Sequence, residues 1–343
     1  MVDLKNPPRL SPQLPRRLLV AFSGGLDSTV LLRWLQLWRQ GADAVSSWSD
    51  LEIQAVHLHH GLQPAADLFE DHCRRICEAW QIPLVVKHAR PSEEACRELG
   101  VEAAARNIRW GLLMELARAQ GAALVLAHHL DDQVETALLQ WMRGAGLEGL
   151  SAMPVLHSVG HDADQAEAVW VWRPLLDVSK EALRDWAVSV GLRWVEDPTN
   201  LSDRHDRNRL RRDVIPILKE MRGGALASMA RSIGHIQHAQ HRLAEQSEAD
   251  LNAVRRKGST LDLGALQGLS SLRRMAVLRA WMRGEGLRMP PARRLEEFDR
   301  QLEQAGPDSH ATLEVHESEF AAGVSFRVCL RAHALHIERP RKE

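Results

Sequence analysis

The sequence lacks long apolar stretches. Its longest unbroken apolar runs are five or six residues, whereas a membrane-spanning helix needs about 20. The start of the chain, with Asp3, Lys5, Pro7 and Pro8, has no apolar core of the kind that a signal peptide requires. We therefore expect a protein that neither spans a membrane nor carries a secretion signal.

Cysteine is also scarce. Only four cysteines occur in 343 residues, at positions 73, 77, 96 and 329, and their spacing is not that of a disulfide framework. Disulfide-stapled secreted domains have regularly spaced cysteines, whereas unpaired cysteines suit a reducing compartment. The sequence therefore predicts a cytoplasmic location.

The chain has almost no net charge. Lys and Arg number 44 and Asp and Glu 45, giving −1 at pH 7, so no global field would attract a polyanion. A nucleic-acid partner would have to meet a local patch, and one segment holds five arginines in nine residues: Arg204, Arg207, Arg209, Arg211 and Arg212. Contacts between such arginines and phosphates release counterions. The alternative is a solvated helix start.

The length predicts two domains, at roughly 150 residues each. Pro216 and the Gly223-Gly224 pair mark the expected boundary, giving domains 1–220 and 221–343. Strands and helices alternate in the first part, which predicts a doubly wound, mostly parallel α/β sheet. The second part has helical periodicity followed by strand alternation, which predicts a smaller α+β domain. The strands expected in the first part are 18–22, 53–58, 84–86, 123–127 and 169–176, and residues 90–99 are expected to form a flap.

One stretch near the start carries the clearest chemical pattern. The apolar run Leu18–Phe22 is followed by Ser23–Gly25, and a helical pattern opens at Ser28. This order predicts a buried strand, a glycine turn and a helix N-terminus. Exposed N–H groups and the positive end of the helix dipole favour phosphate there. The carboxylate of Asp27 would suit Mg²⁺.

This loop differs from two common nucleotide-binding motifs. It has no lysine, which the Walker loop requires, and it lacks the third glycine of the dinucleotide fingerprint. It resembles the S-G-G-x-D-S loop of the N-type ATP pyrophosphatases, or PP-loop enzymes, at all five defined positions. The alternative is a plain glycine turn between strand and helix.

A second polar cluster follows a later predicted strand. The stretch His128–Thr136 holds two adjacent histidines and two adjacent aspartates. On a helix, Asp131 and Glu135 would share one face, and Asp132 would lie on the next. Acids in a first helical turn are often only dipole partners. Because this cluster exceeds what capping requires, we favour a site.

Two further groups are candidates for a phosphate site. His57 lies at the carboxyl end of the predicted strand 53–58, where ligands of open α/β sheets collect. Glu102, Arg106 and Arg109 share a face of a predicted helix. The arginines would suit bidentate phosphate contacts. The alternative is a surface ion-pair ladder worth about 0.3–0.5 kcal/mol per pair.

Taken together, these motifs resemble the tRNA(Ile)-lysidine synthetase family. The resemblance is dense from residue 18 to 218 and thin beyond, and its two most selective stretches are the last two of the following. In chain order they are Ser23–Ser28, His57–Gln63, Glu102–Trp110, His129–Thr136, Arg143–Leu147, Arg173–Leu176, Glu196–Asn200 and Arg207–Arg211.

The resemblance implies an adenine nucleotide alpha hydrolase-like fold and a bacterial, ATP-dependent ligase. In the family, ATP adenylates the 2-carbonyl oxygen of the wobble cytidine in CAU-anticodon tRNA(Ile). The lysine amine then displaces AMP and leaves lysidine, which changes codon specificity from AUG to AUA. The implied cofactors are ATP and Mg²⁺, and the implied partners are L-lysine and the tRNA. The oligomeric state stays open, with a homodimer as one alternative.

The same resemblance assigns roles to individual residues. The implied catalytic residues are Asp27, Arg106, Asp131, Asp132 and Glu135. The implied ATP-binding residues are Ser23, Gly24, Gly25, Leu26, Asp27, Ser28 and His57, with Asp27 and Asp132 as ligands of Mg²⁺. The implied tRNA-binding residues are Arg109, Arg173, Asn200, Arg207, Asn208 and Arg211.

The chain departs from the family pattern in three places. Gln63 replaces an arginine, which removes one possible phosphate contact, and His59 stands where Asn or Asp is commoner. Many members carry a further C-terminal domain beyond the stretch that this sequence covers. We therefore expect reduced or differently built discrimination of the acceptor stem.

Other functions stay open at this point. A tRNA thiolase of the same superfamily would need reactive cysteines, usually in C-x-x-C, whereas Cys73 and Cys77 have three residues between them. A metabolic amide ligase such as NAD synthetase would have no use for the arginine-rich segment. An ATP-binding sensor without turnover would not need the acidic cluster.

Overall fold

The computed structural model of the chain describes Leu4 and residues 11–41, 50–59, 66–160, 168–196, 206–256, 258–287, 289–306, 309, 311–316 and 325–338. It divides into two compact units. The first comprises Met1–Gly160 with Ala166–Gln237, and the second His161–Gln165 with His238–Glu343. The division falls within helix α11 (Ala225–Val254). A domain boundary near residue 220 stays a prediction.

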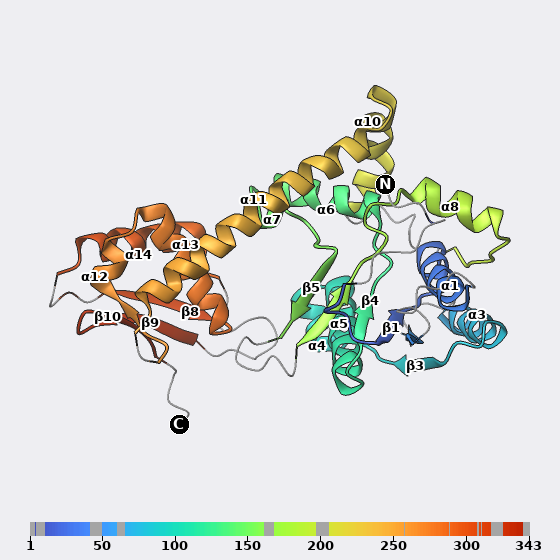
Figure 1. Cartoon of the computed structure of the whole chain (residues 1–343), viewed down its shortest axis with the longest axis horizontal. Coiled ribbons are helices and arrows are strands. Elements are labelled where there is room, and N and C mark those ends of the chain that lie inside the picture. Colours follow the sequence, from blue (N-terminus) through green and yellow to red (C-terminus); the bar gives the residue numbers. More distant parts are fainter. Residues whose placement is uncertain are drawn as a thin grey trace. The chain divides into compact units, whose positions relative to one another are not determined.

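The first unit is built on a six-stranded sheet (Figure 1). Its strands are β1 (Arg17–Ala21), β2 (Glu52–His59), β3 (Leu84–His88), β4 (Ala123–Val125), β5 (Leu156–Val159) and β6 (Val169–Trp172), in the order β3-β2-β1-β4-β6-β5. All neighbouring pairs are parallel except β5 with β6, which is antiparallel. The predicted mostly parallel sheet is confirmed.

Helices follow the strands along the chain of this unit. They are α1 (Leu26–Gln40), α3 (Ala66–Ala79), α4 (Glu93–Leu99), α5 (Val101–Ala119), α6 (Leu130–Met142), α7 (Leu147–Leu150), α8 (Lys180–Ser189), α9 (Asp206–Arg209) and α10 (Ile215–Met221), with a π-helical turn at Leu210–Val214. The stretch 90–99, expected to be a flap, contains α4. Ser92 caps this helix, because its Oγ accepts a hydrogen bond from the Ala95 amide at 3.1 Å.

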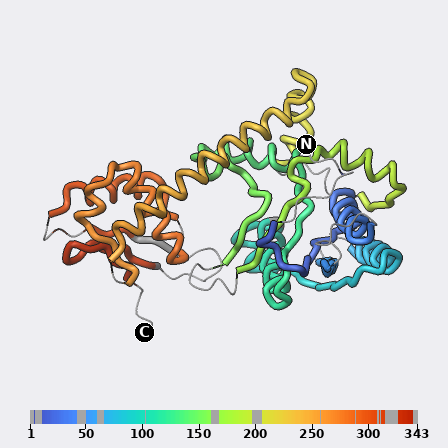
Figure 2. The backbone as a smooth tube through the Cα atoms, in the orientation of Figure 1, coloured from blue at the N-terminus to red at the C-terminus, as the bar shows by residue number. Residues whose placement is uncertain are grey.

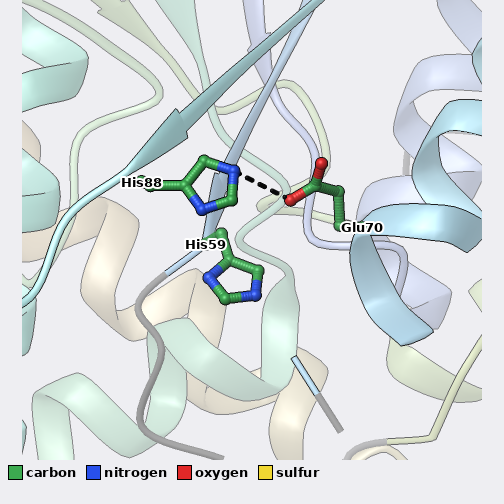
Figure 3. Close-up of side chains that lie close together, drawn as sticks. All are labelled: His59, Glu70 and His88. Atoms are coloured by element: carbon green, nitrogen blue, oxygen red, sulfur yellow. Dashed lines mark ion pairs between the residues drawn. The ribbon is translucent and has the colours of Figure 1, made fainter. Parts of the chain in front are cut away.

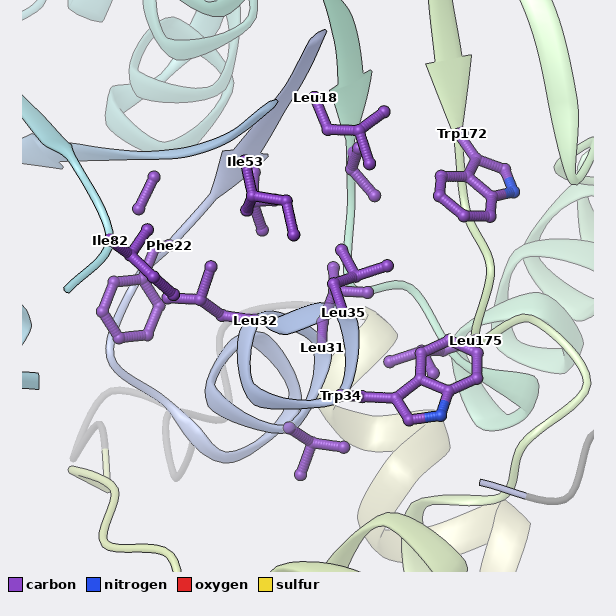
Figure 4. Close-up of a cluster of buried hydrophobic side chains, with 14 of the residues drawn as sticks. Leu18, Phe22, Leu31, Leu32, Trp34, Leu35, Ile53, Ile82, Trp172 and Leu175 are labelled. Atoms are coloured by element: carbon purple, nitrogen blue, oxygen red, sulfur yellow. The ribbon is translucent and has the colours of Figure 1, made fainter. Parts of the chain in front are cut away.

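The sheet is covered on both faces, as a doubly wound fold requires. Leu18 and Val20 of β1 belong to a core formed with α1, α3 and α8, of which Figure 4 shows the part around α1. Leu19, between them, belongs to a second core formed with α5. Successive side chains of a strand point to opposite faces. The apolar run of β1, which precedes the glycine turn, is therefore buried on both faces of the sheet.

The strand order determines where a ligand can bind. The chain passes from β1 outward to β2 and β3, then crosses to β4 on the other side of β1. Where the strand order reverses, the loops after the two central strands part and leave a crevice at their carboxyl ends. The loop Ser23–Gly25 follows β1 and the stretch His128–Glu135 follows β4, so the fold directs both predicted clusters to this switch point.

The second unit, whose backbone is coloured orange to red in Figure 2, has its own sheet and core. Strands β7 (Leu261–Asp262), β8 (Thr312–His316), β9 (Ser325–Arg331) and β10 (Ala334–Glu338) form an antiparallel sheet in the order β7-β10-β9-β8. Helices α12 (Leu263–Gln267), α13 (Ser271–Gly284) and α14 (Ala292–Gln304) pack with it. The predicted α+β character of this part is confirmed.

No helix within the described ranges combines the length and the apolar character needed to cross a membrane.

Candidate active site

The turn after β1 presents the backbone N–H groups at the start of α1. Gly24 has a φ of +82°, and Gly25 is the N-cap residue of the helix. Ser28 donates from Oγ to the Gly25 carbonyl at 3.1 Å, and Thr29 donates to the same carbonyl at 2.8 Å. These two hydrogen bonds stabilise the turn through residues of α1 itself. The first N–H groups of a helix have no intrahelical acceptor, so this end of α1 suits an anion.

A side chain at position 24 would also be crowded. A Cβ atom there would lie 3.1 Å from Sγ of Cys73 and 3.2 Å from Cδ2 of His72, both on α3. The positive φ adds about 1–2 kcal/mol of strain for any other L-residue. Backbone conformation and packing therefore both favour glycine at this position.

His57 supports the strand end next to the turn. It is buried on β2, and its Nδ1 lies 2.9 Å from the carbonyl oxygen of Phe22. Sγ of Cys73 lies 3.4 Å from the same ring nitrogen. These contacts connect β2 and α3 to the residue that precedes the glycine turn. An ATP contact by His57 stays a prediction.

Three buried carboxylates gather at the start of α6. His129 is the N-cap residue of this helix, and Oδ2 of Asp132 accepts a hydrogen bond from the His129 amide at 3.1 Å. Asp131, Asp132 and Glu135 are only 6%, 7% and 1% exposed. Burial of three acids within five residues is costly unless cations compensate them.

His129 connects this acid cluster to the glycine turn. Its Nε2 lies 3.6 Å from Oδ2 of Asp27 and 3.5 Å from Oδ2 of Asp132. Burial alone would lower the pKa of His129, but these two carboxylates and Asp131 outweigh it and raise the pKa above its usual value. Burial likewise opposes ionisation of Asp132, yet the neighbouring histidines and arginines lower its pKa. The structure therefore brings the two predicted clusters together.

Two arginines from the arginine-rich segment neutralise the cluster. Arg207 Nε lies 2.7 Å from Oε2 of Glu135, and Arg211 Nε lies 2.5 Å from Oε1 of the same residue. Arg211 also reaches Oδ1 of Asp132 at 2.7 Å through Nη2. Charge-assisted hydrogen bonds of this kind are the strong ones. Although burial opposes it, the pairing with Glu135 raises the pKa of Arg211.

Asp131 makes different contacts from its neighbours. Its Oδ2 accepts a hydrogen bond from the Lys180 amide at 2.9 Å, at the start of α8, and its Oδ1 lies 3.3 Å from Nζ of Lys219 on α10. In this position Asp131 joins α6 to two other helices. Its predicted catalytic role is untested, and these contacts favour a positioning role.

Arg173 directly follows β6 and is 7% exposed. Its Nε donates to Nδ1 of His128 at 3.2 Å, and its Nη1 donates to the Pro154 carbonyl at 3.1 Å and lies 3.3 Å from Nδ1 of His157. Burial lowers the pKa of Arg173 to about 10 and, together with Arg173, lowers the pKa of His157 to about 4. A contact with tRNA by this guanidinium stays a prediction.

The residues predicted to hold Mg²⁺ fit such an ion. Oδ1 of Asp27 is buried and has no hydrogen-bond partner among the described residues, and Oδ2 of Asp132 lies 3.5 Å from the same His129 nitrogen that Asp27 approaches. Carboxylate oxygens are the ligands that Mg²⁺ prefers. An unpartnered buried oxygen at the anion-binding turn is what a site for a metal–phosphate complex requires.

The remaining predicted residues have varied positions. Arg106 and Arg109 are exposed on α5, and Asn208 is half-buried on α9. Asn200 lies outside the described residues. Sequence reasoning did not assign a role to His129 or Lys219. The pair of adjacent histidines is a sequence signal for His129. No local sequence pattern indicates that Lys219 contacts Asp131 on α6.

Comparison with known proteins agrees with this geometry. Residues 4–218 match the PP-loop domain family, and residues 261–336 match the TilS substrate binding domain. A tRNA(Ile)-lysidine synthase of Salmonella schwarzengrund is 39% identical over 304 residues, covering 89% of this chain and 67% of the relative. The chain belongs to the tRNA(Ile)-lysidine synthase family.

Other relatives agree with this assignment. The lysidine synthase of an Enterobacter strain is 39% identical over 299 residues, covering 86% of this chain and 66% of the relative. The chain thus spans about two thirds of the length of these family members. A solved structure, the U34-tRNA thiolase NcsA of Methanococcus maripaludis with its 4Fe–4S cluster, aligns with a TM-score of 0.53 at 17% identity, over 65% of this chain and 73% of that one. This likeness supports the fold alone.

Cys73 and Cys77 do not favour thiolase chemistry in this family member. Cys73 and Cys77 are buried on α3. Burial raises the pKa of the Cys73 thiol, and it raises the pKa of Cys77 to about 12. The thiolate is the reactive form of cysteine, and both environments disfavour it.

The glycine requirement predicts the effect of one substitution. We expect Gly24→Ala to lower the free energy of unfolding by about 2 kcal/mol or more, from left-handed strain plus overpacking against Cys73, and to weaken ATP binding at least tenfold. Urea unfolding and calorimetric titration with ATP measure the two effects. Gly191→Ala is the control, because Gly191 has a φ of +68° and open space around it. This variant should lose stability through the same backbone strain and should bind ATP with wild-type affinity. Equal ATP affinity in both variants would contradict the assignment.

The lowered pKa of His157 predicts a pH dependence of stability. Below about pH 6.5 the unfolded chain takes up a proton at His157, whereas the folded protein does so only near pH 4. Stability is therefore lost as the pH falls from 6.5 toward 4. His157→Gln, which keeps an acceptor for Arg173, should lose less stability over this range. Urea unfolding at pH 4–8 measures the difference, and parallel profiles for the two proteins would refute the assigned shift.

Proposed function

We propose that this chain forms lysidine in tRNA(Ile). It would join the ε-amine of L-lysine to C2 of the wobble cytidine in the CAU anticodon, converting ATP to AMP and pyrophosphate and changing the codon read from AUG to AUA. The observation that carries the proposal is the position of His129, within 3.6 Å of both Asp27 and Asp132. One residue thus joins a phosphate-binding turn to an acid cluster, within a family of lysidine synthases.

The glycine turn would hold the triphosphate. The backbone N–H groups of Gly25–Ser28 and the dipole of α1 favour the phosphates. Mg²⁺, held by Asp27 and Asp132, would supply charge neutralisation for the departing pyrophosphate. In the first step the cytidine 2-oxygen bonds to the α-phosphorus and the bond to pyrophosphate breaks. Fixed donors aimed at the developing charge are the main means of accelerating such a step.

The acid cluster would hold the lysine. Glu135 and Asp132 are buried carboxylates suited to an ammonium group, and one of them would accept the proton that the amine loses. In the second step the lysine nitrogen bonds to C2 and the bond from C2 to the AMP oxygen breaks. In the structure Arg207 and Arg211 pair with these acids, so lysine would compete with or rearrange these arginines.

The tRNA would contact several basic and polar residues. The proposed contacts are Arg109, Arg173, Asn200, Arg207, Asn208 and Arg211, with Arg106 at the phosphates as a catalytic residue. The match of residues 261–336 to a substrate binding domain supports a role for the second unit in holding the tRNA. Binding through phosphate contacts would weaken steeply with salt. We place this activity in the bacterial cytoplasm, where tRNA is modified.

The ligase proposal predicts which substrates turnover requires. Repeated turnover of ATP to AMP and pyrophosphate should occur only when lysine and a CAU-anticodon tRNA(Ile) transcript are both present with ATP and Mg²⁺. A pyrophosphate-release assay with CAU and non-CAU transcripts, followed by mass spectrometry of the tRNA, measures this. ATP cleavage without tRNA, a sulfur-containing nucleoside, or no turnover on any transcript would refute the proposal.

The acid cluster predicts the effect of removing one charge. We expect Asp132→Asn to lower lysine incorporation by roughly 100-fold, because it removes the charge that faces Arg211 and His129. Asp185→Asn, at an exposed aspartate of α8, is the matched control and should retain wild-type incorporation. Full incorporation by Asp132→Asn would remove Asp132 from the active site.

A further inference from the structure

A group of potential metal ligands lies away from the acid cluster, at the carboxyl ends of β2 and β3. His59 and His88 are partners across these two parallel strands, and Glu70 reaches them from α3 (Figure 3). One ligand atom from each residue lies within 4.8 Å of the other two. The two imidazole rings are stacked, with centroids 4.6 Å apart and planes inclined by 26°. Three donors from three different elements therefore converge.

The carboxylate in this group is already oriented. Arg74 holds Oε1 of Glu70 through Nη2 at 2.7 Å and Nε at 2.9 Å. The other oxygen, Oε2, lies 3.1 Å from Nε2 of His88. Hydrogen bonds from surrounding residues commonly orient metal-ligating carboxylates in this way.

A fourth potential ligand, the carboxylate of Asp67, lies beside His59. Oδ1 of Asp67 is 2.9 Å from Nε2 of this histidine. Asp67 either completes a four-ligand set or fixes the ring through the nitrogen that does not bind the ion, as carboxylates do beside ligating histidines. The side chain of His88 is 63% exposed, so its ring can rotate out of the stack and direct a lone pair at an ion.

We propose that His59, Glu70 and His88 bind a divalent transition-metal ion of the Zn²⁺ class, with Asp67 as fourth ligand or orienting partner. Imidazole and carboxylate are donors that Zn²⁺ uses, and four such donors meet its usual coordination number. Mg²⁺, which prefers all-oxygen sites, is disfavoured here. This site is separate from the Asp27 and Asp132 pair proposed for Mg²⁺.

The ion would stabilise the packing of α3 and β2 beneath the glycine turn. Glu70 and Cys73 lie three residues apart on α3, and Cys73 contacts both His57 and the space beside Gly24. His57 and His59 lie two residues apart on β2, so they share a face. A metal bridge between α3 and the two strands would therefore fix the elements that support the turn. It would act on stability, with no contact to the reacting atoms.

Direct metal binding tests the site without tRNA, lysine or ATP. Chelator-stripped full-length protein is titrated with Zn²⁺ against a chromophoric zinc indicator, with millimolar Mg²⁺ present to occupy oxygen-ligand sites. We expect one ion per chain, with at least tenfold weaker binding in His59→Ala and in His88→Ala. His241→Ala is the matched control, because His241 lies 3.3 Å from Glu245 in an exposed pair, and it should bind zinc as the wild type does.

A thermal measurement checks that the ion binds the folded protein. Zinc at 100-fold above its dissociation constant should raise the unfolding midpoint of the wild type by about 5 °C, and His88→Ala should show no rise. Circular dichroism establishes that the variants are folded. Zinc binding of equal strength in the wild type and both histidine variants, or no stoichiometric binding at all, would overturn the proposal.

Discussion

Compensation of the buried acids at the start of α6 is the constraint on which the site depends. Three carboxylates beside one helix N-terminus would destabilise the fold if they were left unpaired. Each has a cationic partner from another segment, namely Arg207 from α9, Arg211 from the π-helical turn or Lys219 from α10, and the His129 amide at the N-cap adds a donor to Asp132. The cations that neutralise these buried acids also attach α9, the π-helical turn and α10 to α6.

The glycine turn is placed beside this network by the topology of the sheet. β1 and β4 are neighbours at the point where the strand order reverses, so their following loops meet at one crevice. Asp27 contacts this network through His129, and its other carboxylate oxygen has no hydrogen-bond partner in the part of the chain that the structure describes. His57 and Cys73 pack below the turn, where Gly24 has a positive φ that favours glycine. Phosphate binding and acid burial are thus parts of one structural arrangement.

Much of this arrangement could be predicted from the sequence, because its signals are local. The apolar run Leu18–Phe22, the alternation of strand and helix patterns, and the polar residues at strand ends predicted the sheet and the meeting of the two clusters. The cap at Ser92, which starts α4, is also a local signal, although the polar and acidic composition of residues 90–99 favours a flap. The partners of Glu135 lie 72 and 76 residues away along the chain, and no local pattern encodes such pairs. The burial of Arg173 and the approach of Glu70 to His88 likewise arise only from tertiary packing.

The most direct measurement is a crystal structure of the chain with Mg²⁺, an unreactive ATP analogue and L-lysine. The account predicts β- and γ-phosphate oxygens within hydrogen-bond distance of the backbone N–H groups of Gly25–Ser28. It also predicts the lysine ammonium against Asp132 or Glu135, with Arg207 or Arg211 displaced from its partner. A triphosphate bound away from the turn, or lysine bound at another surface, would contradict the account.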